Sequence, residues 1–315
     1  MNYRELGRTG LKLSTVSYGA ASIGNEYGNA TDEGRGIRSL HVALDGGVNF
    51  IDTSPYYGRT LAEKVLGRAF KEIPRDRFIL GTKCGRYDVD GFDFSHDRIL
   101  RSVDESLQRM GVEYIDIMQC HDIEFGNMQQ VVDEALPALH KAKEQGKIRF
   151  IGVTGFPLKI FRYILDRAPL DCMLSYCHYS LNNTSLLDLI PYLKSKGVGI
   201  MSASPFSERL LTRQALPTWH HAPQVLKDQC RKAVEHCDGK GVDIASLAIQ
   251  FCIEHPDITT TVAGTANPDN MANILKWMNE PVDRQLLSDV FQILEPVKNT
   301  LWPVGRTENR DESNT

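Results

Sequence analysis

Hydrophobic runs and amphipathic segments alternate along most of the chain. Apolar runs of strand length lie at residues 16–19, 48–52, 78–83, 114–120, 150–154, 173–177, 198–202 and 259–262. In the stretches between them, apolar residues recur every three or four positions, as Ile37, Leu40 and Leu44 do, which predicts helices. We expect helices near 32–45, 61–71, 95–110, 128–144, from 158 onward, and near 186–193, 224–237, 243–254, 268–278 and 283–294. This alternation predicts an α/β fold with parallel strands.

Two parallel architectures fit the alternation, an open doubly wound sheet and a closed (β/α)8 TIM barrel. The open sheet that binds dinucleotides normally carries G-x-G-x-x-G after its first strand, whereas residues 19–24 read Gly-Ala-Ala-Ser-Ile-Gly. No P-loop motif is present either. We therefore predict one barrel domain over residues 1–306, beginning with an N-terminal β-hairpin at 3–13. The polar residues 307–315 predict a disordered tail.

Four polar residues fall at or just after the ends of three successive predicted strands: Asp52, Tyr57, Lys83 and His121. Active sites of barrels lie at this end of the strands. Asp52 can pair with Lys83, whose burial would otherwise be costly, and a nearby ammonium favours the phenolate form of a tyrosine. His121 can hydrogen-bond a substrate oxygen. Each residue alone has an ordinary structural explanation, but together they support proton transfer during carbonyl–alcohol redox, with hydride carried by a cofactor.

Composition narrows the function further. The 315 residues carry a net charge of −4 and are 42% hydrophobic, which is typical of a soluble protein and gives no reason to expect a nucleic-acid or membrane partner. The seven cysteines form no C-x-x-C pair, so we expect free thiols and a cytoplasmic location. There is no apolar signal core and no bilayer-length apolar run. The pair His220-His221 lacks a third ligand at suitable spacing, so we predict a surface loop and no metal site.

Several stretches resemble the aldo-keto reductase family over nearly the whole chain. They are residues 46–53 (Gly-Gly-Val-Asn-Phe-Ile-Asp-Thr) with Tyr57, Thr82-Lys83, Cys120-His121 and residues 145–149 (Gln-Gly-Lys-Ile-Arg). The resemblance implies a (β/α)8 barrel, a nicotinamide cofactor and a catalytic tetrad. The members of that tetrad are Asp52, Tyr57, Lys83 and His121.

Residues 82–87, 119–126, 174–179 and 293–299 resemble one branch of the family more closely. That branch oxidises the anomeric C1 hydroxyl of L-galactose to a lactone, and in plants it serves ascorbate synthesis. The resemblance implies that Tyr57 acts as the general base while hydride leaves C1. Two alternatives stay open: a dehydrogenase for another aldose such as L-fucose, and a non-catalytic nucleotide-sensing subunit like the potassium channel beta subunits that share the fold.

The resemblance also bears on the choice of cofactor. Family members that use NADP place a lysine where Gly264 stands and an arginine where Asn270 stands. Without these cations a 2′-phosphate loses its charge-assisted partners, so we predict NAD. The alternative is that another cation, such as Lys276, takes their place.

Further binding residues follow from the resemblance. We expect the cofactor to contact Gly19, Ala20, Thr154, Ser175, Ser204, Pro205, Phe206, Ala263, Gly264, Thr265 and Asn270. Two positions depart from the family, since Gly155 replaces an asparagine and Ala203 an aromatic residue. We expect the sugar to contact Tyr57, His121, Arg86 and Asp122, with Tyr87, Glu124 and His178 as further candidates. The sequence leaves both a monomer and a homodimer open.

Overall fold

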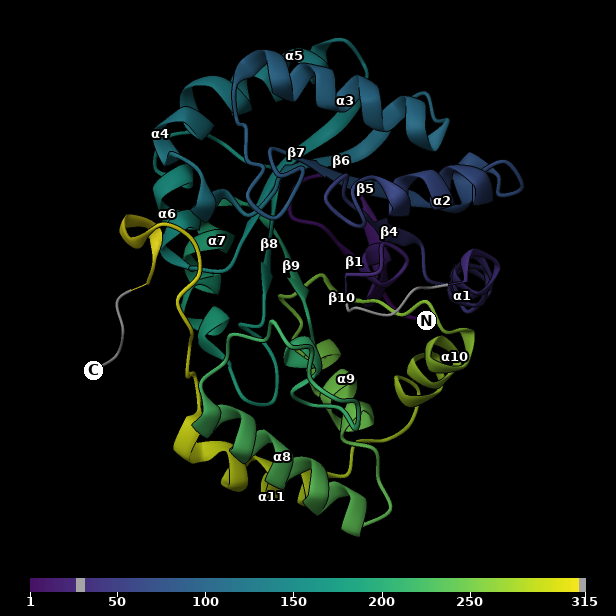
Figure 1. The fold of residues 1–315 in the computed structure, drawn as a ribbon, viewed down its shortest axis with the longest axis vertical. Helices are drawn as coiled ribbons and strands as arrows, with labels where there is room; N and C mark the ends of the chain where they lie inside the picture. Colours follow the sequence, from purple (N-terminus) through teal and green to yellow (C-terminus); the bar gives the residue numbers. More distant parts are fainter. Residues whose placement is uncertain (27–31, 312–315) are drawn as a thin grey trace.

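The strands of the protein close into a parallel barrel, as seen in a computed structural model that describes residues 1–26 and 32–311. Within these residues eight strands pair in the order β10-β3-β4-β5-β6-β7-β8-β9, and β10 pairs with β9 to complete the ring. The predicted (β/α)8 barrel is confirmed, and the open sheet is excluded. Helices surround the strands, with α8 and α11 side by side at one end of the molecule and α3 and α5 at the other (Figure 1).

The predicted strands and helices are found close to their expected positions. The barrel strands are β3 (Val16–Gly19), β4 (Phe50–Asp52), β5 (Ile79–Cys84), β6 (Ile115–Cys120), β7 (Ile148–Gly155), β8 (Cys172–Tyr176), β9 (Gly199–Ala203) and β10 (Thr260–Ala263). The α-helices are α1 (Glu33–Asp45), α2 (Leu61–Ala69), α3 (His96–Met110), α4 (Met128–Gln130), α5 (Leu136–Glu144), α6 (Lys159–Leu165), α7 (Ile190–Lys196), α8 (Gln224–Gly239), α9 (Ile244–Glu254), α10 (Pro268–Trp277) and α11 (Arg284–Leu294). A π-helical turn, Val131–Ala135, joins α4 to α5. Short 3-10 turns lie at Ala20–Ser22, Arg75–Arg77, Ile123–Phe125, Ser185–Asp188, Ser207–Arg209, Glu295–Val297 and Thr307–Asn309.

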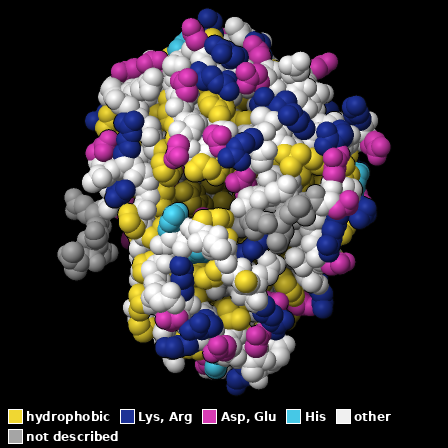
Figure 2. All heavy atoms as spheres, in the orientation of Figure 1, with side chains coloured by type: hydrophobic (Ala, Val, Ile, Leu, Met, Phe, Trp, Pro, Cys, Tyr) yellow, Lys and Arg dark blue, Asp and Glu magenta, His cyan; other side chains and the backbone are white. Residues whose placement is uncertain are grey.

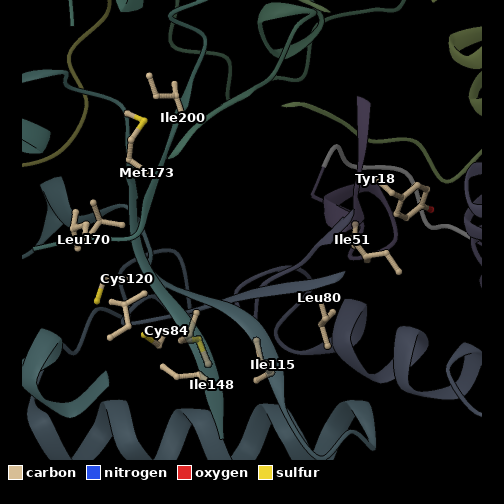
Figure 3. Packing of buried hydrophobic residues seen from close by; sticks show 14 of the residues in the cluster. Tyr18, Ile51, Leu80, Cys84, Ile115, Cys120, Ile148, Leu170, Met173 and Ile200 are labelled. Atoms are coloured by element: carbon tan, nitrogen blue, oxygen red, sulfur yellow. The ribbon is translucent and has the colours of Figure 1, made fainter. Parts of the chain in front are cut away.

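The two faces of each strand have different neighbours. Ile51, Leu80 and Ile115 belong to the apolar layer between strands and helices (Figure 3). Each fully buried side chain of this size contributes about 1.5–3 kcal/mol relative to exposure. On β5 the side chain of Lys83 takes the opposite face from Leu80, because successive strand residues alternate. The alternation therefore directs Lys83 into the barrel, where it bonds Asp52.

An N-terminal hairpin closes one end of the barrel. Its strands, β1 (Tyr3–Glu5) and β2 (Lys12–Ser14), pair antiparallel as predicted. Leu6, directly after β1, and Leu13, on β2, are fully buried and pack with Phe50 in the barrel interior. The turn lies against the start of β9, since a Cβ on Gly7 would lie 2.4 Å from the backbone nitrogen of Gly199. The opposite end of the barrel, where the strands finish, carries the four polar residues that the sequence predicts to be catalytic.

The C-terminal segment corrects one prediction. Residues 307–311 were expected to be disordered, but Thr307–Asn309 form a 3-10 turn and the Asn309 side chain is buried. Its Nδ2 donates to the carbonyls of Glu124 (2.8 Å) and Gly126 (3.0 Å). The polar composition misled the prediction because these polar groups satisfy backbone carbonyls of a barrel loop. Residues 312–315, the rest of the expected tail, lie outside the described part of the chain.

Two other expectations concern cysteines and histidines. All seven cysteines are free and buried, as predicted. The His220-His221 pair is not a surface pair, because His220 is buried beside Trp302, with 5.8 Å between ring centroids; its Nδ1 accepts a hydrogen bond from the backbone of Ala222. Within residues 1–26 and 32–311, no helix combines the length and the apolar character that a bilayer crossing requires.

Candidate active site

Lys83 contacts two other predicted catalytic residues, Asp52 and Tyr57, at the mouth of the barrel. Its Nζ lies 2.6 Å from Asp52 Oδ2, 2.8 Å from the carbonyl oxygen of Thr53 and 3.4 Å from the phenol oxygen of Tyr57. Neighbouring strands create this contact, since Asp52 at the end of β4 lies beside Gly81 of β5 and Lys83 follows two residues later. The sequence prediction that Asp52 pairs with Lys83 agrees with this geometry.

The pair of Asp52 and Lys83 is almost fully buried, with 3% and 1% of each residue exposed. Burial raises the pKa of Asp52, and the attraction of Lys83 opposes that rise. A buried ion pair of this kind is tolerated only when its remaining hydrogen-bonding positions are filled. Here Gln119 Nε2 lies 3.5 Å from Asp52 Oδ1, and the ammonium has three oxygen partners. The pair therefore holds one N–H of Lys83 toward Tyr57.

His121 also contacts Tyr57. The two rings meet edge to face, with centroids 5.7 Å apart and planes at 89°. Burial lowers the pKa of His121 to about 3, although the nearby Asp122 opposes that shift. The imidazole is therefore neutral at physiological pH and keeps one N–H. Its Nδ1 lies 2.9 Å from Ser54 Oγ, and its Nε2 lies 3.6 Å from Asp122 Oδ2.

The two further residues predicted to bind substrate lie next to His121. Arg86 forms an ion pair with Asp122 and stacks on the ring of Tyr56, with 3.8 Å from the guanidinium carbon to the ring centroid. Burial alone would lower the pKa of Arg86, but Asp122 and neighbouring groups reverse this and raise it. Asp122 itself has a left-handed backbone with φ of +48°. The structure thus gives Tyr56, which the sequence left without a role, a place under the guanidinium.

Thr154, predicted to contact the cofactor, holds Asp122 in this conformation. Its hydroxyl accepts from the Asp122 backbone N–H at 3.0 Å and donates to Asp122 Oδ1 at 3.3 Å. The glycine that follows has a steric reason, because a Cβ on Gly155 would lie 2.2 Å from Ile160 Cδ1 and 2.6 Å from Glu124 Oε2. An asparagine there, as many family members carry, would require the side chains of Ile160 and Glu124 to move.

The further candidates for contact with the sugar, Tyr87, Glu124 and His178, form hydrogen bonds within the protein. Glu124 is fully buried and accepts from the backbone N–H of Phe156 at 3.0 Å, and burial raises its pKa well above the usual range. His178 is also fully buried, with its Nδ1 2.8 Å from the carbonyl oxygen of Tyr176. The Tyr87 hydroxyl accepts from the backbone of Gly85. Glu124 and His178 are therefore less available to a sugar than Arg86 and Asp122.

The residues predicted to hold the cofactor lie at the ends of β3, β7, β8, β9 and β10, in the loops after them or, for Asn270, in α10, on the part of the rim outside the tetrad strands β4, β5 and β6. At the junction of β3 and β10, a Cβ on Gly264 would lie 2.2 Å from the carbonyl oxygen of Gly19. The backbone of Gly264 thus packs too closely against that of Gly19 to admit a side chain. The buried hydroxyl of Ser175 has no hydrogen-bond partner among the described residues, and Ser204 has a φ of +60°. Bare backbone and an unsatisfied hydroxyl fit a nicotinamide dinucleotide.

Thr265 lies before α10, and Asn270 lies in the first turn of that helix. The carbonyl oxygen of Thr265 accepts from Ser39 Oγ at 2.6 Å, and its hydroxyl accepts from the Asn267 backbone at 3.1 Å. Asn270 Nδ2 lies 3.5 Å from the Thr265 hydroxyl.

Figure 2 shows one face of the molecule hollowed near its centre, with hydrophobic side chains on the floor of the hollow.

Two site residues were missed by the sequence reasoning. Ser54 is fully buried against His121 and lies inside the stretch that contains Asp52 and Tyr57, so its position was a usable signal. Glu208 has a left-handed backbone with φ of +52°, and burial together with Asp122 raises its pKa to about 7, against the opposing effect of Arg86. Nothing in the local sequence marks Glu208. Across the described ranges, no group of three histidine, cysteine or acidic residues could hold a metal ion.

Comparison with known proteins decides the family. The sequence profile of the aldo/keto reductase family matches residues 15–295. The chain belongs to the aldo-keto reductase family. It is therefore an oxidoreductase that uses a nicotinamide cofactor, as the tetrad implied. An aldo-keto reductase from Bacillus halodurans, solved in its holo form, superposes with a TM-score of 0.80 at 25% identity, covering 99% of this chain and 100% of that one.

Two curated relatives are sugar dehydrogenases by name. L-galactose dehydrogenase of Arabidopsis thaliana is 48% identical, and the match covers 97% of this chain and 98% of that protein. D-arabinose 1-dehydrogenase of Saccharomyces cerevisiae is 32% identical, and the match covers 76% of this chain and 75% of that protein.

Proposed function

We propose that the protein oxidises the C1 hydroxyl of L-galactose, or of a closely related aldose, to the aldonolactone with NAD. The observation that carries the proposal is the tetrad geometry, in which Lys83 bonds both Asp52 and Tyr57, within a chain 48% identical to an L-galactose dehydrogenase. The similarity to D-arabinose 1-dehydrogenase favours another aldose as the second candidate. A non-catalytic nucleotide-sensing subunit is disfavoured, because such a role gives no reason to keep a buried ion pair aimed at a phenol.

In the proposed reaction the chain's residues move one proton and position one oxygen. Tyr57, as the phenolate, takes the proton from the C1 hydroxyl while Lys83 stabilises the phenolate charge. His121 donates an N–H to the same sugar oxygen and holds C1 near Tyr57. A bound nicotinamide supplies the acceptor for the hydride that leaves C1. The C1–H and O–H bonds break, and the C1=O bond of the lactone forms.

Recognition of the sugar is assigned to the groups beside His121. Asp122 carries a carboxylate, and carboxylates accept hydrogen bonds from hydroxyl groups. Arg86 bonds this carboxylate and lies over Tyr56, so it fixes the carboxylate and offers further donors. A sugar needs several directed polar contacts of this kind, because a site built to bond a hydroxyl rejects analogues that lack it.

The preference for NAD rests on the rim at β10. Gly264 has no space for a side chain, so a lysine at that position cannot reach a 2′-phosphate without a backbone shift. Lys276, the cation that could take over, is 70% exposed in its side chain and pairs with Glu280 at 3.6 Å. The acidic Asp269 in the first turn of α10 would repel a phosphate. These features support NAD over NADP.

The location and pathway are further parts of the proposal. Seven free, buried cysteines support a reducing compartment such as the cytoplasm. A place in ascorbate synthesis rests on the resemblance to the plant branch alone.

A panel of aldoses with each cofactor tests the proposal. Initial rates with L-galactose, L-fucose and D-arabinose should give the highest kcat/KM for L-galactose with NAD. Turnover of another aldose alone would transfer the function to the second candidate. Cofactor binding without turnover of any aldose would favour the nucleotide-sensing alternative.

A further inference from the structure

Ser54 places a hydroxyl directly behind the catalytic histidine. It lies two residues after Asp52 and is completely buried. Its Oγ is 2.9 Å from His121 Nδ1 and 3.1 Å from the backbone nitrogen of Tyr56. These are the two hydrogen bonds that the hydroxyl makes within the described part of the chain. The turn between Asp52 and Tyr57 therefore also contacts the side of the imidazole that faces away from the substrate.

The two contacts determine where the serine proton goes. The backbone N–H of Tyr56 can only donate, so Ser54 Oγ accepts that bond. If Nδ1 also carried a proton, Oγ would accept twice and its own O–H would be buried without an acceptor. Leaving a buried donor unsatisfied costs about 1–3 kcal/mol. The favoured arrangement has the hydroxyl donating to a bare Nδ1.

The opposite edge of the imidazole gives the same answer independently. His121 Nε2 lies 3.6 Å from Asp122 Oδ2, and Asp122 is held as a carboxylate by its ion pair with Arg86. A bare Nε2 would turn a lone pair toward this negative oxygen, whereas a protonated Nε2 turns a donor toward it. Both edges of the ring therefore favour a proton on Nε2.

We propose that Ser54 is a positioning residue that fixes His121 in the tautomer with its proton on Nε2. That tautomer directs an N–H toward the substrate oxygen, and the other directs a lone pair there. The identity of the oxygen as the C1 oxygen of a sugar rests on the proposed function. The tautomer itself does not, since it follows from Ser54, Tyr56 and Asp122 alone.

The test compares Ser54→Ala with Ser54→Thr, which keeps a hydroxyl. Nitrogen-15 NMR of the histidine-labelled, full-length protein reports which ring nitrogen of His121 is protonated, and a His121→Asn variant assigns the signal. We expect a bare Nδ1 in the native protein and in Ser54→Thr, and a mixture of tautomers in Ser54→Ala. Ser17→Ala removes a different buried hydroxyl, one bonded to Thr260, and should leave the His121 signal unchanged.

Kinetics provide the second readout. Ser54→Ala should lower kcat about 10-fold with a smaller change in KM, because the loss of one hydrogen bond of this kind is worth roughly one order of magnitude, and Ser54→Thr should restore most of it. A bare Nδ1 retained in Ser54→Ala would overturn the proposal, as would protonated Nδ1 in the native protein. If no aldose is turned over, the NMR result still decides the role of Ser54, so failure of the proposed function is distinguishable.

Discussion

The ammonium of Lys83 lies 2.6 Å from the carboxylate of Asp52, and both groups are almost entirely shielded from water. The charge of each residue therefore offsets the cost of burying the opposite charge in the barrel. Removing one partner of a buried ion pair leaves an uncompensated charge and typically costs about 3–5 kcal/mol.

A double-mutant cycle tests this mutual dependence. Asp52→Asn and Lys83→Met should each lower the free energy of unfolding by roughly 3 kcal/mol or more, and the double variant should lose clearly less than the sum. Urea unfolding of the four proteins measures the three changes. Losses that add without coupling would show that the pair does not stabilise the site in this way.

Tyr57 is expected to carry the proton transfer. Tyr57→Phe removes the phenol that lies 3.4 Å from Lys83 Nζ, and activity should fall by about 10²–10⁴-fold. Cofactor affinity, measured by fluorescence titration, should stay close to that of the native protein. The control is Tyr56→Phe, which keeps the ring under Arg86 and should retain most activity. Comparable losses in both variants would remove the assigned role of Tyr57.

Substitutions at Asn270 and at Gly264, on the same part of the rim, should affect cofactor use in different ways. Asn270→Arg introduces a cation at the start of α10, and kcat/KM with NADP should rise about 10-fold because charge-assisted bonds to phosphate are strong. Gly264→Ala should impair both cofactors and lower stability by about 1–3 kcal/mol, since its Cβ would lie 2.2 Å from the carbonyl oxygen of Gly19. Full activity of Gly264→Ala with either cofactor would contradict the packing argument.

Glu208 should make stability depend on pH. Its pKa is raised to about 7 in the folded protein, chiefly by burial, so the folded state holds this proton more tightly than the unfolded state does. Stability is then lost as pH rises from about 4.5 to about 7. Glu208→Gln removes the penalty and should stabilise the protein by roughly 1–3 kcal/mol at pH 8, with little effect at pH 4.5.

Thermal unfolding of Glu208→Gln and the native protein at both pH values measures this difference. An equal shift in Tm at the two pH values would show that Glu208 does not carry a raised pKa.

The barrel and the proximity of the four polar residues at its rim were predictable because both follow from local patterns. Strand and helix periods fix the alternation, and the ends of parallel strands bring Asp52, Lys83 and His121 to one rim. Roles that depend on approach in space were not predictable. The link from Ser54 to His121 spans 67 residues, and Glu208 gains its environment from Asp122 and Arg86.

Amino-acid composition alone did not predict the structure of the C-terminal segment. Residues 307–311 are polar and were expected to be disordered, yet Asn309 bonds the carbonyls of Glu124 and Gly126. Composition reports that a segment lacks apolar residues. It does not report that another loop presents unsatisfied carbonyls, which here supply the reason for order.

The proposed hydride transfer from C1 of the sugar to NAD is tested most directly by following the hydrogen at C1. L-Galactose labelled with deuterium at C1 is incubated with the enzyme and NAD, and both products are examined by mass spectrometry and NMR. We expect one deuterium transferred to the reduced cofactor, a galactonolactone as the sugar product, and loss of the transfer in Tyr57→Phe. Absence of turnover, or reduced cofactor without deuterium, would contradict the proposed hydride transfer.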